Sequence, residues 1–176
     1  LPIALRIAAS FLAVHLDIPP SEYAARSRDR RARLAALKSE DDAELNVEAV
    51  FESSYALLAP ETQTHWRVLS VFPAPFDVPA AASVWNVEQD AARAALSDLV
   101  RFSLLNYEPG ESGQGTVNTD HYPLTTDHYF LHDLLRDFAD ARMSDDERAT
   151  TQLRHAQHYL QVARAADDLY LQGGDH

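Results

Sequence analysis

The stretch "SLLNYEPGESGQGTVNTDHYPLTTDHYFL", residues 103–131, decides the predicted fold, because the sequence pattern changes there from helical to extended. Its two ends, SLLNY (103–107) and DHYFL (127–131), favour short strands. The 19 residues between them hold three of the chain's five glycines, which indicates a long turn. Two strands around a long turn, after three helices, are the plan of a winged-helix domain.

Helical patterns fill the sequence before these strands. The expected helical segments are 46–58, 60–72, 79–85 and 87–103, with PAPFD (73–77) as a short connector. Asn46 is placed to cap the first of them, and Pro60 opens the second. Asn86 and Gln89 form a predicted capping box before the last one.

The N-terminal part predicts a piece of a helical bundle. The helix in LPIALRIAASFLAVHL (1–16) is apolar on most sides, as a core helix is, and Pro19 and Pro20 end it. The arginine-rich helix at 21–38 has a solvated face as its plainest interpretation. The acidic segment SEDDAEL (39–45) is the best domain boundary in the chain.

Helical periodicity returns after the second strand. Leu131, Leu134, Leu135 and Phe138 form one apolar stripe of a helix over 131–142. Ser144 and Glu147 form a second predicted capping box and open a final helix. Its apolar residues are small or aromatic, which suits a helix that meets a partner helix, so we expect the start of a TPR-like helical array.

The composition is that of a globular chain: 176 residues, 46% of them hydrophobic. We find no apolar run long enough for a membrane span and no secretory signal. The lack of cysteine excludes disulfides and thiolate metal sites. We expect a cytoplasmic location. The chain begins at Leu1, as a piece cut from a longer protein would.

The negative charge is concentrated in the middle of the chain. The formal net charge is −12, and residues 46–143 hold 5 Lys and Arg against 14 Asp and Glu. Such a segment repels phosphate backbones. The charge distribution therefore argues against nucleic-acid binding.

Several motifs occur in one order that resembles a known family. They are LPIAL (1–5), an intervening helix, VFESSYALLAPETQTHWRVLSVFPAPFD (50–77), AALSDLVRFSLL (94–105) and LHDLLRDFA (131–139). This order resembles the second half of the NB-ARC module of STAND regulatory ATPases, found in apoptosome proteins, plant disease-resistance proteins and many bacterial regulators. LPIAL looks like the family's Gly-Leu-Pro-Leu-Ala-Leu motif without its glycine, and LHDLLRDFA looks like its Met-His-Asp motif. The resemblance covers about residues 1–143.

The resemblance implies a nucleotide-dependent switch. In the family, ADP is buried between a nucleotide-binding domain, a small helical domain and the winged helix. The proline of the first motif, here Pro2, would pack near the adenine. The histidine of the second, here His132, would contact the β-phosphate, and Asp133 would help to hold the motif. Leu131 replaces the commonest methionine, which conserves side-chain volume.

The chemistry of His132 agrees with that role. A helix N-terminus offers free N–H groups and partial positive charge to a phosphate, and a neutral imidazole can donate a hydrogen bond there. Asp133 suits the same helix start without any ligand, and Pro2 suits the first position of any helix.

The sequence lacks the residues that hydrolyse ATP. No glycine precedes Gly110, and no Gly-x-x-x-x-Gly-Lys-Ser/Thr motif is present. We therefore expect no enzymatic activity from this chain. ADP or ATP would be bound by the full-length parent protein, and we expect no tight cofactor binding by this chain alone.

Metal binding and nucleophilic catalysis have little support. His128 with His132, and His155 with His158, lie about one helical turn apart in the sequence, but no third ligand stands at a matching spacing. No motif places a histidine beside Ser53, Ser54 or Thr64, so we predict no metal site and no nucleophile.

Two other functions stay open. Winged helices often bind DNA, and then residues 87–103 would enter the major groove. The charges of that segment sum to −1, whereas a recognition helix is usually basic. The third possibility is a protein-interaction scaffold without a ligand.

The predicted fold class is therefore mainly α, with a winged-helix domain flanked by helical-bundle segments. The expected domains are a helical-domain remnant (1–45), the winged helix (46–143) and the start of a C-terminal helical array (144–176). The predicted function is the regulatory part of a switch that closes over ADP and relays its state by domain rotation. Its partners would be an N-terminal nucleotide-binding domain and C-terminal helical repeats of the same chain.

Overall fold

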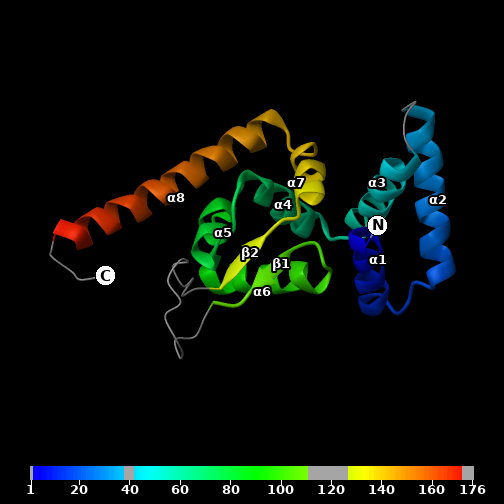
Figure 1. Cartoon of the computed structure of the whole chain (residues 1–176), viewed down its shortest axis with the longest axis horizontal. Helices are drawn as coiled ribbons and strands as arrows, with labels where there is room; N and C mark the ends of the chain where they lie inside the picture. Colours follow the sequence, from blue (N-terminus) through cyan, green and yellow to red (C-terminus); the bar gives the residue numbers. More distant parts are fainter. Residues whose placement is uncertain (1, 38–41, 111–126, 172–176) are drawn as a thin grey trace.

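The computed structural model describes residues 2–37, 42–110 and 127–171, and only the backbone of residues 2, 30–37, 42–47 and 169. Within these ranges the chain has eight α-helices, one short 3₁₀ helix and one antiparallel pair of strands. The structure confirms the predicted mainly helical fold class with a small β wing (Figure 1).

Three helices form a bundle at the N-terminal end of the molecule (Figure 1). They are α1 (Pro2–Val14), α2 (Pro20–Leu37) and α3 (Asp42–Tyr55), and α3 packs against both others. Ile7, Phe11, Tyr23 and Phe51 are buried in or beside this bundle. A 2.7 Å hydrogen bond between the Tyr23 hydroxyl and Ser54 Oγ ties α2 to α3 in the interior.

The first residues of α3 correct two sequence predictions. Because α3 begins at Asp42, residue Asn46 lies inside the helix and does not cap it. Residues 42–45 of the predicted acidic connector are also helical, since acidic residues are favourable in a first helical turn. Residues 39–41 of that connector lie outside the described residues. The proposed domain boundary stays a prediction.

The next elements have the order and pairing of a winged helix. They are α4 (Pro60–Val68), the 3₁₀ helix η1 (Leu69–Val71), α5 (Val78–Trp85), α6 (Gln89–Arg101), β1 (Asn106–Glu108) and β2 (His128–Phe130). Tyr107 of β1 is opposite Tyr129 of β2 in the antiparallel register. The first strand starts three residues later than predicted, and the turn at 111–126 lies outside the described residues.

Phe76 adds a third short extended piece to this sheet. Its N–H donates to the Tyr129 carbonyl at 2.9 Å, and the Tyr129 N–H donates back to the Phe76 carbonyl at 2.8 Å. The predicted connector at 73–77 therefore contributes the strand position that winged helices have between their first two helices. No strand pattern in the sequence predicts it.

Asn86 ends one helix instead of starting the next, so the predicted capping box with Gln89 is wrong. Its φ of 58° and ψ of 51° are left-handed, and Asn is one of the residues that tolerate this conformation. The Asn86 N–H donates to Ser83 and the Val87 N–H donates to Ala82, the pattern of a Schellman motif. Glu88 is the N-cap residue of α6, and its side chain makes no capping hydrogen bond.

Ser103 ends α6 in the same way and points the chain into β1. Its φ is 55°, and its N–H and that of Leu104 donate to Val100 and Leu99. Ser103 Oγ lies 2.7 Å from Ser10 Oγ of α1. This turn is therefore also a contact between the bundle and the winged helix.

Two more helices complete the chain: α7 (Asp133–Asp140) and α8 (Asp145–Leu171). The inner half of α8 packs against α5, and its outer half extends away from the body (Figure 1). Ser144 Oγ accepts from the Glu147 N–H at 3.2 Å, which confirms half of the predicted capping box. The Glu147 carboxylate instead accepts two contacts from Arg67 Nε, at 3.0 and 2.9 Å. No helix in the described ranges is long and apolar enough to cross a membrane.

Asn86 gives a direct test of this turn. We expect Asn86→Gly to keep or raise the free energy of unfolding, because glycine has no steric cost at positive φ. We expect Asn86→Val to lose about 1–2 kcal/mol, since left-handed backbone is costly for a branched residue. Urea unfolding measures both, and equal stability of the two variants would contradict the left-handed helix end.

Candidate functional site

His132 is the N-cap of α7, directly after strand β2. Its backbone is extended, with φ −64° and ψ 142°, and its Nδ1 accepts a hydrogen bond of 3.3 Å from the Leu134 N–H. An imidazole that accepts at Nδ1 and is neutral carries its proton on Nε2. The side chain is exposed, so this geometry offers an N–H donor to a ligand in solvent, at the positive end of a helix.

Asp133 supports the helix start. Its carboxylate is 3.0 Å from Arg136 Nη2, one turn further along α7, and 79% of its side chain is exposed. An exposed ion pair of this kind contributes little stability, but it occupies the carboxylate and favours the helix dipole. Asp133 is therefore a surface residue of the first turn of α7 that pairs within its own helix.

The rest of α7 anchors this start in the core. Leu131, Leu135 and Phe138 are buried, as the predicted apolar stripe requires. Leu134 is 48% exposed, so the prediction placed it wrongly in that stripe. Within α7, only Leu135 and Phe138 of the predicted stripe are buried, because the first turn of the helix is at the surface.

The structure describes only the backbone of the second predicted site residue, Pro2. Pro2 begins α1, in agreement with a helix-opening proline, and its side chain lies outside the described residues. The helix it starts does contact the winged helix. Arg6 Nη2 donates to Asn106 Oδ1 at 2.9 Å, and the Phe11 and Phe102 rings stack with centroids 5.1 Å apart.

His128 is in β2 and His132 caps α7, whereas His155 and His158 are both in α8. Among the described residues, no group of three or more His, Cys, Asp or Glu side chains is arranged to hold a metal ion. His155 packs against the Phe72 and Tyr159 rings, with centroids 5.2 and 4.8 Å away. Its Nε2 is buried and has no hydrogen-bond partner among the described residues.

A groove of ≈ 320 Å³ lies between α4, α5 and the start of α8. Val68, Val84 and Trp85 are its apolar lining residues, and Asp146 and Arg154 are among the polar ones. Arg154 Nη1 donates to the Val84 carbonyl at 3.2 Å, and His65 stacks on Trp85 at 4.7 Å. The polar groups here mostly bond within the protein, so the groove marks where α8 docks.

Two histidines at the contact between α8 and the winged helix, His65 of α4 and His155 of α8, are shifted toward their neutral forms. Burial lowers the pKa of His65 below its ordinary value of 6.5, and the nearby Glu61 opposes part of that shift. Burial also lowers the pKa of His155, and the neighbouring His158 lowers it further. Both imidazoles are therefore favoured uncharged where α8 packs on the winged helix.

Comparison with known proteins finds similarity to bacterial regulators. The chain is 35% identical over 149 residues to "Regulatory protein AfsR" of Streptomyces coelicolor (strain ATCC BAA-471 / A3(2) / M145). It is 34% identical over 149 residues to the protein of the same name from Streptomyces griseus. Each match covers 84% of this chain but 13% of the relative. The chain is thus similar to one segment of much longer regulatory proteins.

Two other comparisons give no match. No protein-family model matches the chain, and no solved structure matches it.

The lowered pKa values predict that α8 docks less stably in acid. A histidine whose pKa is lower in the folded state than in the unfolded state binds more protons when unfolded. Above pH 6.5 the neutral histidine costs the folded state nothing. The free energy of unfolding then falls as the pH drops from 6.5 through the lower pKa of the folded state. We expect His155→Phe to reduce the loss of unfolding free energy between pH 7.5 and 5, measured by urea titration. The same slope in wild type, His155→Phe and His65→Phe would contradict the assignment.

Proposed function

We propose that this chain is the regulatory part of a nucleotide-dependent signalling switch. In this proposal a nucleotide-binding domain elsewhere in a longer protein holds ADP, and the winged helix closes over it. His132 contacts the β-phosphate in the closed state and leaves it when ATP replaces ADP. The winged helix then rotates and passes the nucleotide state to the rest of the protein.

The observation that carries this proposal is the geometry of His132. Its Nδ1 is used by the Leu134 N–H, which leaves Nε2–H as the outward donor. It stands at a helix N-terminus, where the helix dipole favours an anion. A hydrogen bond to a charged phosphate is worth about 1.5–3 kcal/mol. That magnitude is enough to shift a two-state equilibrium substantially.

The similarity to the two AfsR proteins supports a regulatory role. Both are described as regulatory proteins, and their match covers 84% of this chain. The resemblance of the motifs in residues 1–143 to the NB-ARC module supports the finer proposal, that ADP or ATP is the ligand and that Pro2 packs near the adenine.

In this proposal the hydrolysis of ATP takes place outside this chain. The sequence contains no phosphate-binding Gly-x-x-x-x-Gly-Lys-Ser/Thr loop, so hydrolysis would belong to the nucleotide-binding domain. Helix α8 would begin the array of C-terminal repeats, because its outer half exposes Leu160, Tyr170 and Leu171. The contribution of this chain is then a differential one, since a ligand shifts a conformational equilibrium only by binding the two states unequally.

The proposal predicts that His132 controls ADP affinity in the full-length protein. We expect His132→Ala to weaken ADP binding roughly ten- to a hundredfold by calorimetry, which corresponds to one charged hydrogen bond. His132→Asn is the matched control variant, because asparagine is a strong N-cap and keeps the helix start without an imidazole donor. We expect it to lose ADP affinity while keeping the stability of α7.

Three outcomes separate the explanations. Loss of affinity in both variants supports a phosphate contact. Loss in His132→Ala alone would assign His132 to helix capping only. Unchanged ADP binding in both folded variants would leave the chain as a protein-interaction scaffold.

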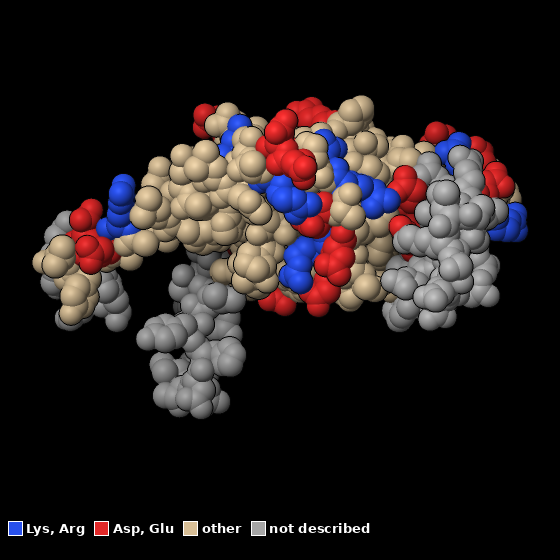
Figure 2. Space-filling view, turned by 90° about the horizontal axis from the view of Figure 1, so that it is seen from above, with Lys and Arg blue, Asp and Glu red and all other residues tan. Residues whose placement is uncertain are grey.

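DNA binding is the second candidate, and the winged-helix arrangement favours it. The surface of α6 does not. Its exposed charges include Asp90, Arg93 and Asp98, and Arg101 already pairs with Asp98 at 3.3 Å. Figure 2 shows the face opposite α6, where basic and acidic side chains are interleaved.

The charge balance predicts no DNA binding of physiological strength. We expect no salt-dependent shift of nonspecific duplex DNA below high micromolar protein, because phosphate contacts by Lys and Arg supply that affinity. A mobility-shift or anisotropy titration at low and high salt measures this. A micromolar complex that weakens steeply with salt would make DNA binding the better assignment.

A further inference from the structure

We propose that Arg142 is a positioning residue that couples the His132 helix to helix α3 of the N-terminal bundle. This inference rests on the proposed function of His132. It adds the residue through which movement at the nucleotide would reach the bundle, and the observations that carry it are the contacts of one side chain.

Arg142 follows the last turn of α7 and bonds to residues of both α7 and α3. Its Nη1 donates to the Phe138 carbonyl at 2.9 Å, and its guanidinium carbon lies 3.2 Å from the centre of the Phe138 ring. Its Nη2 donates to the carboxylate of Glu52 in α3. The ring of Tyr55, also in α3, lies 5.7 Å away. One cation therefore closes the C-terminal end of α7 and holds α3 beside it.

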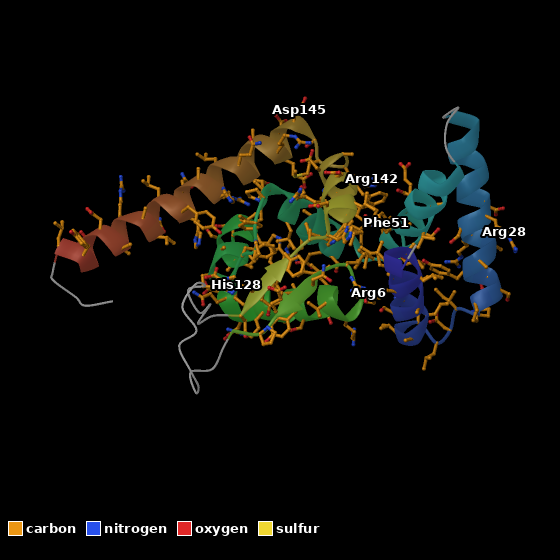
Figure 3. The ribbon with its side chains drawn as sticks, in the orientation of Figure 1. Arg6, Arg28, Phe51, His128, Arg142 and Asp145 are labelled. Atoms are coloured by element: carbon orange, nitrogen blue, oxygen red, sulfur yellow. The ribbon has the colours of Figure 1, made fainter. Side chains whose placement is uncertain are left out.

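The Glu52 side of this contact is fixed within the bundle. In the sequence Glu52 follows Phe51, which is buried, and precedes Ser53 and Ser54, which bond to Ser27 and Tyr23 of α2. The Phe51 ring also meets the Phe138 ring edge-on, with centroids 5.6 Å apart. Figure 3 shows Arg142 and Phe51 at the boundary between α7 and α3. The ion pair is thus aligned by apolar packing on both helices.

The two ends of α7 then act as one rigid body. The helix has eight residues, so it spans roughly 12 Å at 1.5 Å per residue. His132 caps its first turn and Arg142 follows its last turn. A displacement of His132 by a ligand moves the whole helix, because packed helices shift as units. The Arg142–Glu52 pair is a polar contact to α3 that such a movement would break or carry with it.

Arginine suits this position better than lysine. A planar guanidinium stacks on an aromatic ring and bonds to a carboxylate and a carbonyl at the same time. Lysine keeps the charge but gives up the stack and the fixed fork. Arg142→Lys therefore loosens the contact but keeps a cation near Glu52.

The test is a double-mutant cycle on the full-length protein, with the ratio of ADP to ATP affinity as the readout. We expect Arg142→Lys to lower the preference for ADP about fivefold or more, and Glu52→Gln to do the same from the α3 side. In the His132→Asn background we expect Arg142→Lys to have little further effect, since residues that act through one another are not additive. Circular dichroism identifies any variant that fails to fold, and Glu52→Gln then replaces Arg142→Lys.

Arg148→Lys is the matched control, because Arg148 pairs with Asp140 at the same end of α7 but joins it to α8. We expect no change in its nucleotide preference. Equal effects of Arg148→Lys and Arg142→Lys, or additive effects of Arg142→Lys and His132→Asn, would overturn the positioning role while His132 keeps its own. No effect of His132→Asn would instead reject the proposed function on which the inference rests.

Discussion

The structure depends on the burial of Trp66 in α4. Its side chain is fully buried, and its indole N–H donates to the Leu104 carbonyl at 3.0 Å, which fixes the turn between α6 and β1. Its ring lies 5.7 Å from the ring of Tyr55 in α3 and 5.9 Å from that of Phe138 in α7. One aromatic residue therefore sets the spacing of four elements. Because an indole of this size cannot move within a close-packed core without displacing its neighbours, the position of α7 is fixed from beneath.

This constraint explains why an exposed histidine can be well placed. The N-cap geometry of His132 is local, but the helix it caps is held by Leu135 and Phe138 in the core and by Arg142 at its far end. The charged and capping groups lie at the surface and the aromatic groups beneath it. The proposed switch would need this arrangement, since the contacts that bind a ligand must be able to separate while the helix that carries them stays intact.

The sequence predicted the helices well and the junctions poorly. Prolines and apolar periodicity located α1, α4 and α7, because these signals are local. Asn86 was misplaced because asparagine suits both a helix start and a left-handed helix end, and only the tertiary path decides between them. Phe76 was missed because a single paired residue between two prolines has no strand pattern. For the candidate site, the sequence located His132 and Asp133, but Arg142 and Glu52 are 90 residues apart and no local pattern connects them.

The most direct test of nucleotide sensing by His132 is a structure of the full-length protein with ADP bound. We expect His132 Nε2 to lie within hydrogen-bond distance of a phosphate oxygen, about 2.7–3.2 Å, while Nδ1 still accepts from the Leu134 N–H. A His132 side chain that faces solvent in the ADP complex, with α7 in the same place, would contradict the nucleotide-sensing role and leave His132 as a helix cap.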